Sequence, residues 1–145
     1  MKNIMVAIDF ESGALELLRQ AETLAKGLEA KIWLIHVAAP DPDFVGLDAG
    51  PQTVRDQRAD ELHDEHQKIQ TWADQLAKKG IEAEALLVQG STVKTIKQKQ
   101  EELNIDLLVI GSHQHGWLFQ TLLGSTRDEL LKNHEIPVLL VPMPN

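Results

Sequence analysis

The chain has 145 residues, about the size of one ordinary domain, and its 14 Lys and Arg against 22 Asp and Glu give a formal net charge of −8. Negative charge dispersed in this way argues against broad binding of nucleic acid or anionic membranes, because both need clustered positive charge. Cysteine is absent, which excludes disulfides, thiolate metal sites and thiol redox chemistry. The sequence therefore predicts one domain over residues 1–145 with no nucleic-acid partner.

The opening residues, MKNIMVAIDF, enter a strand-like segment at once, without the apolar stretch and small-residue cleavage site of a secretory signal. The longest apolar runs, such as IPVLLV, are far too short to span a bilayer. We therefore expect a cytoplasmic protein without a membrane partner.

Short runs rich in Val and Ile alternate along the chain with longer amphipathic segments, as in βα units stacked on a parallel sheet. The predicted strands are residues 4–8, 31–37, 84–88, 106–110 and 137–141. Several of these runs are apolar throughout, which is typical of strands that are buried on both faces.

Two helices are predicted between the first three strands. Ser12 is suited to cap the first helix. The apolar stripe of that helix consists of Leu17, Leu18, Ala21, Leu24, Ala25 and Leu28. Residues 53–79 predict a second, more charged helix that stops at Gly80. Its apolar positions are Leu62, Ile69, Trp72, Ala73 and Leu76.

Two shorter helices complete the pattern. Ser91 caps a third helix that turns Val93, Ile96 and Leu103 inward, and a fourth runs from about residue 124 to residue 133. Between strand two and the long helix, the 38–52 loop is rich in Pro, Gly and Asp and has no periodicity. A loop of that length is either a functional lid or a disordered segment, and the sequence leaves both open.

These elements predict a single α/β domain with a doubly wound, five-stranded parallel sheet, strand order 3-2-1-4-5 and helices on both faces. In such sheets ligands bind beyond the carboxyl ends of the strands, where the strand order reverses. Asp9 ends strand one and Gly111 follows strand four. We therefore expect these two residues to meet in one crevice.

The stretch GSHQHGWLFQTLLGST at residues 111–126 has the glycines and hydroxyls of a phosphate-binding loop. Gly111 lets the backbone turn sharply after Ile110 and approach a ligand without a Cβ. Gly124, Ser125 and Thr126 then open a helix, whose free N–H groups favour phosphate oxygens. A Walker A loop is not supported, because the lysine that should follow Gly116 is replaced by Trp117.

With these residues the chain resembles the universal stress protein family over nearly its whole length. Nucleotide-binding members of that family carry G-x2-G-x9-G-[ST] after the fourth strand, and this chain has Gly111, Gln114, Gly124 and Ser125 at the same spacing. The Asp at the end of strand one, the HV pair in strand two, the Gly-Ser pair after strand three and the closing PVLLVP are also similar.

The resemblance implies an ATP-binding regulatory protein with an adenine-nucleotide α-hydrolase-like fold, commonly a homodimer joined through its last strand. It implies that Asp9 contacts the ribose or adenine region and that Val37 and Ile110 flank the base. It assigns the ribose and phosphates to Gly111, Gly124, Ser125 and Thr126. ATP is the expected cofactor, with or without Mg²⁺.

Gln114 departs from the motif, because it replaces the second glycine. Its Cβ and amide crowd a backbone–phosphate contact, and a positive φ is harder for it to adopt. A branch of the family that does not bind ATP also has non-glycine residues in this loop. That branch tends to lose the Gly-Ser pair that this chain keeps at Gly124 and Ser125, so the motif as a whole favours nucleotide binding.

Three functions stay in competition. The first is a nucleotide-binding regulatory protein of the stress response with little or no turnover. The second is slow ATP hydrolysis, with Asp9 as the only acid in the predicted crevice, and the third is a nucleotide-free dimer that acts through protein contacts. Metal binding by His63 and His66 is disfavoured, because an exposed, charged helix face explains the segment ADELHDEH more simply. Loop histidines 113 and 115 need no function, and the role of Trp117 stays open.

Overall fold

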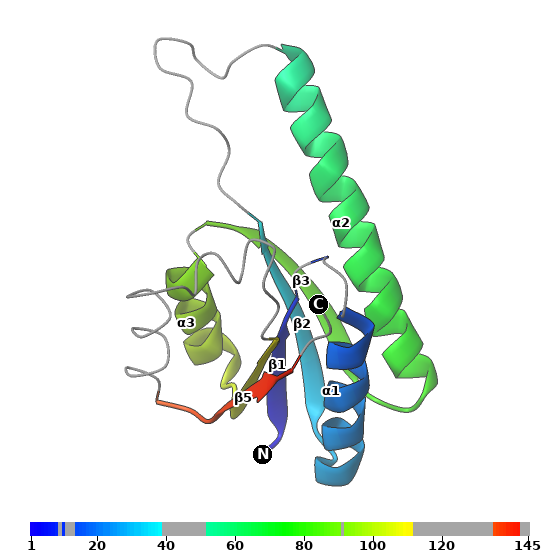
Figure 1. Cartoon of the computed structure of the whole chain (residues 1–145), viewed down its shortest axis with the longest axis vertical. Helices are drawn as coiled ribbons and strands as arrows, with labels where there is room; N and C mark the ends of the chain where they lie inside the picture. The colour runs from blue at the N-terminus through cyan, green and yellow to red at the C-terminus, as the bar shows by residue number, and fades with distance from the viewer. Residues whose placement is uncertain (9, 11–13, 39–51, 91, 112–134, 143–145) are drawn as a thin grey trace.

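The computed structural model describes residues 1–8, 10, 14–38, 52–90, 92–111 and 135–142, with the backbone alone at 52–55 and 92 (Figure 1). The strands are β1 (Asn3–Ala7), β2 (Lys31–Ala38), β3 (Ala83–Gln89), β4 (Leu107–Gly111) and β5 (Val138–Val141). The helices are α1 (Ala14–Leu28), α2 (Gln52–Lys78) and α3 (Thr92–Leu103). The fourth predicted helix, residues 124–133, and residues 39–51 of the predicted loop lie outside the described part of the chain.

The strands form one parallel sheet in the order β3-β2-β1-β4-β5, which confirms the predicted topology. Every strand begins and ends within one residue of its predicted bounds. The small shifts arise because backbone hydrogen bonds, not apolar side chains, set the ends of a strand. At the start of the sheet, for example, the Lys31 N–H donates to the Lys2 carbonyl at 2.8 Å.

The two faces of the sheet bury separate sets of side chains. On one face, Ile4, Val6 and Ile8 of the first strand pack with residues of α1 and α2. On the other face, Met5 and Ala7 pack with Val93 and Ile96 of α3. The predicted placement of helices on both faces is therefore confirmed, and β1 lies at the centre of both cores (Figure 1).

Most of the predicted apolar stripe of α1 is buried. Leu17, Leu18, Ala21 and Ala25 all face the sheet. Leu28 was expected on the same stripe, but it is 42% exposed, because α1 ends at this residue beyond the edge of the core. Trp33 and Trp72, which the sequence places in the core, are half-buried at its margin.

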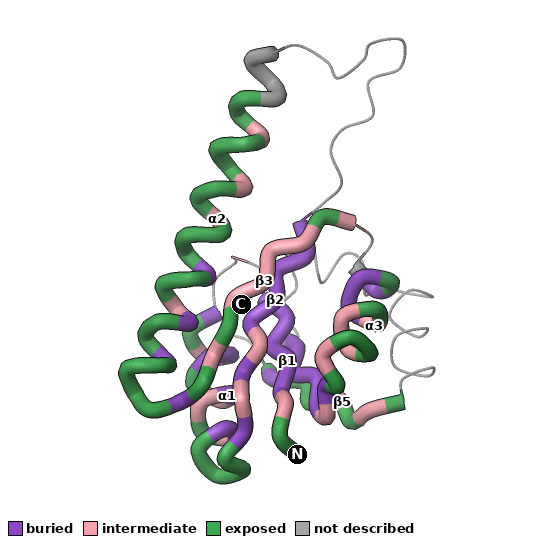
Figure 2. The backbone as a smooth tube through the Cα atoms, turned by 180° about the vertical axis from the view of Figure 1, so that it is seen from behind, coloured by how far each residue is buried: buried purple, intermediate pink, exposed green. Residues whose placement is uncertain are grey.

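Helix α2 is much longer than the strands on which it packs. Its 27 residues span about 40 Å, and in Figure 1 its first half projects past the carboxyl end of the sheet. Ile69, Ala73 and Leu76 are buried, whereas residues 56–68 include no buried residue, as Figure 2 shows. Leu62 was expected on the buried stripe but is only half-buried, because the sheet does not extend far enough to cover it.

The ends of the helices agree with the local sequence. Gly80 has a φ of 84°, a left-handed conformation in which glycine carries no Cβ penalty, so the predicted stop of α2 is confirmed. Its N–H donates to the Ala77 carbonyl, and the Ile81 N–H reaches back to the Leu76 carbonyl. Within the described residues, no helix is both long enough and apolar enough to cross a membrane.

The carboxylate of Asp106 ties the amino end of the chain to the segment before β4. It accepts hydrogen bonds from the backbone N–H groups of Lys2 at 2.8 Å and Asn3 at 3.0 Å. The bond from Lys2, followed by the bond from Asn3, lowers the pKa of this carboxyl. The same segment is tied back to β1 through the Asp106 N–H, which donates to the Asn3 carbonyl.

We expect Asp106→Ala to lower the free energy of unfolding by about 1 kcal/mol at neutral pH, because two backbone donors lose their acceptor. Since the pKa is lowered in the folded chain, this contribution is present above the unfolded pKa and is lost as pH falls through the folded pKa. The difference in the free energy of unfolding between the native chain and Asp106→Ala should therefore become smaller below about pH 4. Urea unfolding at neutral and acid pH measures it, with the exposed-site variant Glu101→Ala as control. A difference that grows on acidification would contradict the assignment.

Candidate functional site

The strand order reverses between β1 and β4, and the carboxyl ends of these two strands form the candidate site. Their register pairs Val6 with Val109, and continuing it by two residues brings Ile8, the residue after β1, level with Gly111, the last residue of β4. The ends of β1 and β4 therefore lie at the same edge of the sheet, whereas Asp9 lies outside the described residues and its expected meeting with Gly111 stays a prediction. This is the edge at which a doubly wound sheet binds its ligands.

Three of the residues assigned to the site by resemblance are described by the structure, and they lie together. Val37 of β2 and Ile110 of β4 face the α3 side of the sheet, with the small side chain of Ala7 in the strand between them. The side chains of Val37 and Ile110 are only 1% and 3% exposed. Both are therefore apolar core side chains on either side of β1, and neither supplies a polar group.

Gly111 departs from its predicted role in one respect. A sharp turn was expected directly after Ile110, but Gly111 is the last residue of β4 and pairs with Val141 of β5. The ladder of backbone hydrogen bonds thus continues through this glycine. Gly111 still lacks a Cβ, so its backbone can be approached closely from the carboxyl end of the sheet.

The other residues assigned to the site lie outside the described part of the chain. They are Asp9, Gln114, Gly124, Ser125 and Thr126. Ile8 and Phe10, the residues on either side of Asp9, are described by the structure and follow the end of β1. The assignment of these five residues to nucleotide contacts therefore stays a prediction.

Gly90 shapes the neighbouring turn between β3 and α3. Its φ is 151°, its N–H donates to the Ala38 carbonyl at 3.2 Å, and a Cβ added to it would lie 2.9 Å from Oγ1 of Thr95. Both the backbone conformation and the contact with the buried Thr95 thus require glycine. This turn holds the start of α3 against the carboxyl end of β2.

A polar contact beside the site was not predicted from the sequence. His36 of β2 is buried, and its Nδ1 lies 2.6 Å from the carbonyl oxygen of Ile8, the residue before Asp9. A carbonyl oxygen only accepts, so Nδ1 carries the proton and donates it. Its other ring nitrogen, Nε2, lies 3.4 Å from Oε2 of Glu65 on α2. The available signal was a single histidine within the apolar run IWLIHVA.

Aromatic rings enclose this contact. The ring of Phe10 lies 4.5 Å from the His36 ring and 5.7 Å from the Trp72 ring, measured between centroids. The ammonium of Lys68 lies 5.4 Å from the Phe10 centroid and 5.9 Å from that of Trp72. The end of β1 is therefore packed against α2 by an aromatic cluster with charged groups at its margin.

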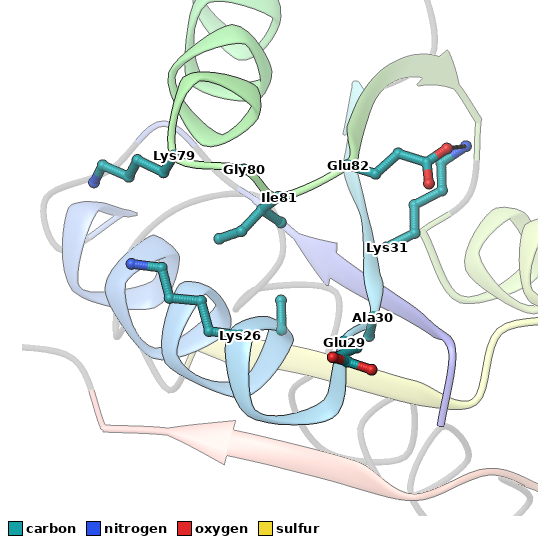
Figure 3. A pocket seen from close by; sticks show the side chains of 9 residues that line it. Lys26, Glu29, Ala30, Lys31, Lys79, Gly80, Ile81 and Glu82 are labelled. Carbon is teal, nitrogen blue, oxygen red and sulfur yellow. Dashed lines mark ion pairs between the residues drawn. The ribbon is translucent and has the colours of Figure 1, made fainter.

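A cavity of about 380 Å³ lies at the opposite, amino end of the sheet, where α1 and α2 end (Figure 3). Its lysines already have partners: Lys26 and Lys79 both contact Glu22, at 2.8 and 3.0 Å, and Lys31 contacts Glu84 at 2.9 Å. Because these charges are compensated, the cavity offers no net attraction for an anion. It lies away from the candidate site and takes no part in it.

The described residues contain no group of three or more His, Cys, Asp and Glu side chains placed to hold a metal ion. His63 and His66 are both exposed on α2. At the ends of β1 and β4, the described residues Ile8, Ile110 and Gly111 supply backbone groups and apolar side chains.

The sequence profile of the universal stress protein family matches residues 1–142. The universal stress protein A homolog of Haemophilus influenzae is 32% identical over 143 residues, which covers 98% of this chain and 96% of that protein. Universal stress protein MJ0531 of Methanocaldococcus jannaschii is 28% identical over 145 residues, covering 99% and 83%.

Solved structures share the fold. Universal stress protein UspA from Lactobacillus plantarum matches with a TM-score of 0.77 at 18% identity, over 97% of both chains. The universal stress protein from Archaeoglobus fulgidus in complex with dAMP matches at 0.59 and 19% identity, over 97% of this chain and 98% of that one. A universal stress protein in complex with cAMP matches at 0.64 and 20% identity, over 97% and 96%.

Proposed function

This chain belongs to the universal stress protein family, and from that premise we propose that it binds an adenine nucleotide, ATP in the first instance, and acts as a regulatory protein of the stress response. In this proposal it has little or no catalytic turnover. The nucleotide occupies the crevice beyond the carboxyl ends of β1 and β4.

One observation carries the proposal: Ile8 and Gly111 come level at the point where the strand order reverses. The segments that continue from these two residues hold Asp9 on one side and the Gly124, Ser125 and Thr126 motif on the other. Val37 and Ile110 supply an apolar floor of the kind that suits a purine base. The backbone amides of a helix start would then meet the phosphates.

The ligands of the matched structures support the same class of molecule. One of them was solved with dAMP and another with cAMP. Both ligands share the adenine ring, so we infer that this ring is what the floor of Val37 and Ile110 receives. ATP, with or without Mg²⁺, adds the phosphates for which the 124–126 motif is suited.

Gln114 is the feature that favours a second candidate, a nucleotide-free dimer that acts through protein contacts. Mass spectrometry of small molecules released when the purified protein is denatured separates the two. We expect an adenine nucleotide to be released from the native chain, at a level well above that from a Gly124→Trp variant purified in parallel. Equal release from both proteins would mean that nucleotide is carried over without a site. A native chain without nucleotide that also fails to bind added ATP would favour the second candidate.

We further propose that two chains join through β5. This strand lies at the edge of the sheet with β4 as its neighbour, and Leu139 and Leu140 are 36% and 43% exposed. An apolar edge strand with unpaired backbone groups favours pairing with another copy. The dimer belongs to both candidate functions and does not distinguish between them.

We expect Leu139→Lys to raise the dissociation constant of the dimer at least tenfold. Each interface gains two charges, one from each chain, and both must lose water when the chains pair. Light scattering and sedimentation over a range of micromolar concentrations measure the mass. Leu15→Lys is the matched control, since Leu15 is 70% exposed and belongs to α1 rather than to β5. A native chain that is monomeric at these concentrations, or a control that dissociates equally, would count against an interface at β5.

A further inference from the structure

The contact between His36 and Glu65 lies where α2 leaves the sheet. Below it, Ile69, Ala73 and Leu76 anchor the helix in the core. Beyond it, residues 56–64 have no buried side chain. Glu65 thus contacts a buried polar group of the sheet one helical turn before Ile69, the first buried residue among the described side chains of α2.

The protonation of His36 decides whether Oε2 of Glu65 faces a hydrogen-bond donor or a lone pair. Nδ1 must keep its proton to donate to the Ile8 carbonyl, so the ring gains or loses a proton only at Nε2. Oε2 of Glu65 is buried and has no hydrogen-bond donor, although Nε2 is 3.4 Å away. In the neutral ring, lone pairs of Nε2 and the carboxylate face each other. In the imidazolium, Nε2–H points a donor and a positive charge at that oxygen.

The surroundings make this difference matter. The His36 ring is buried and lies 4.5 Å from the Phe10 ring, and such a low-dielectric setting strengthens electrostatic interactions. On α2 the charged neighbours are Lys68, whose ammonium lies over the Phe10 ring, and Arg58, which contacts Glu61 at 3.4 Å. The flanking strands present uncharged groups, namely the Ile8 carbonyl on β1 and Leu87 on β3.

We propose that His36 and Glu65 form a proton-dependent latch that ties α2 to the sheet at the base of its projecting half. With a proton on Nε2, the imidazolium pairs with the Glu65 carboxylate and the latch is closed. Without that proton, the neutral ring faces the carboxylate with no donor and the projecting half of α2 opens more often. The latch does not depend on nucleotide binding, so its test stands apart from the function proposed above.

Hydrogen exchange of the full-length protein, read by mass spectrometry at about pH 5.5 and pH 8.0, tests the latch across the range in which histidine titrates. After correction for the intrinsic pH dependence of exchange, we expect residues 56–66 to exchange about threefold to tenfold faster at the higher pH. Residues 69–76 of the same helix, which are anchored in the core, are the internal reference. Light scattering confirms that the mass is the same at both pH values.

Glu65→Gln is the decisive variant, because it keeps the shape of the side chain and removes its charge. The partly exposed position lets the variant fold, and its pH dependence in residues 56–66 should disappear. A double variant, His63→Gln with His66→Gln, removes the exposed histidines of the same helix and should keep the native behaviour. The latch is overturned if the native chain shows no pH dependence, if Glu65→Gln retains it, or if the double variant loses it.

Discussion

Replacing Gly124 with Trp is expected to abolish binding of adenine nucleotide, whereas replacing Gln114 with Gly is expected to tighten it about fivefold, or about 1 kcal/mol. In the proposed site the phosphates meet backbone amides at a helix start, and a side chain at 124 would occupy the space where they approach. In the same proposal, Gln114 would obstruct only its own part of the loop and would leave those amides available. Glycine there relieves one crowded contact and adopts a positive φ without strain.

Equilibrium dialysis with labelled ATP measures both variants against the native chain. Circular dichroism and the urea midpoint confirm that each variant is folded. Trp at residue 120 in place of Gln is a matched control for bulk, because Gln120 lies in the same loop but outside the glycine motif. If Gly124→Trp binds as tightly as the native chain, the 124–126 motif does not hold the phosphates.

Leu108→Ala is expected to lower the free energy of unfolding by about 3 kcal/mol. Leu108 is fully buried on β4, where it pairs with Met5 of β1 and Val138 of β5 and faces α3. Removing its side chain leaves a cavity in the middle of the sheet, which tightly paired strands cannot close. The loss is a large fraction of the stability of a domain of this size.

Urea unfolding at one protein concentration measures the effect as a shift of the midpoint with an unchanged slope. The control is the same substitution at Leu15, which is 70% exposed on α1 and should change the free energy of unfolding by less than about 0.5 kcal/mol. Equal losses for both variants would mean that burial on β4 does not dominate the stability of the sheet.

The strands could be predicted closely because most of their residues are apolar and the order of elements agrees with a known family. Side-chain periodicity is less informative about where a helix loses its support. The apolar spacing of α2 continues through Leu62, yet the sheet ends before that residue and leaves it half-buried. For the same reason the stripe of α1 predicted burial for Leu28, which lies beyond the core.

The positions of Val37, Ile110 and Gly111 at strand ends could be predicted, since the apolar runs define those strands, and their contact with a nucleotide stays a prediction. The contact between His36 and Glu65 could not, because it joins β2 to a helix position that is set by how far α2 runs before it reaches the core. Sequence spacing carries no information on that distance. The turn expected after Ile110 was placed too early, because pairing of Gly111 with Val141 extends β4 by one residue.

Calorimetric titration of ATP into the native chain and into Gln114→Gly tests the central claim most directly. The account predicts saturable heat with about one nucleotide bound per chain for both proteins, tighter for Gln114→Gly, and no heat for Gly124→Trp. AMP in place of ATP should bind more weakly, because it lacks the phosphates that the 124–126 motif is proposed to hold. Absence of heat with ATP for both the native chain and Gln114→Gly would contradict the account and leave the nucleotide-free dimer as the function.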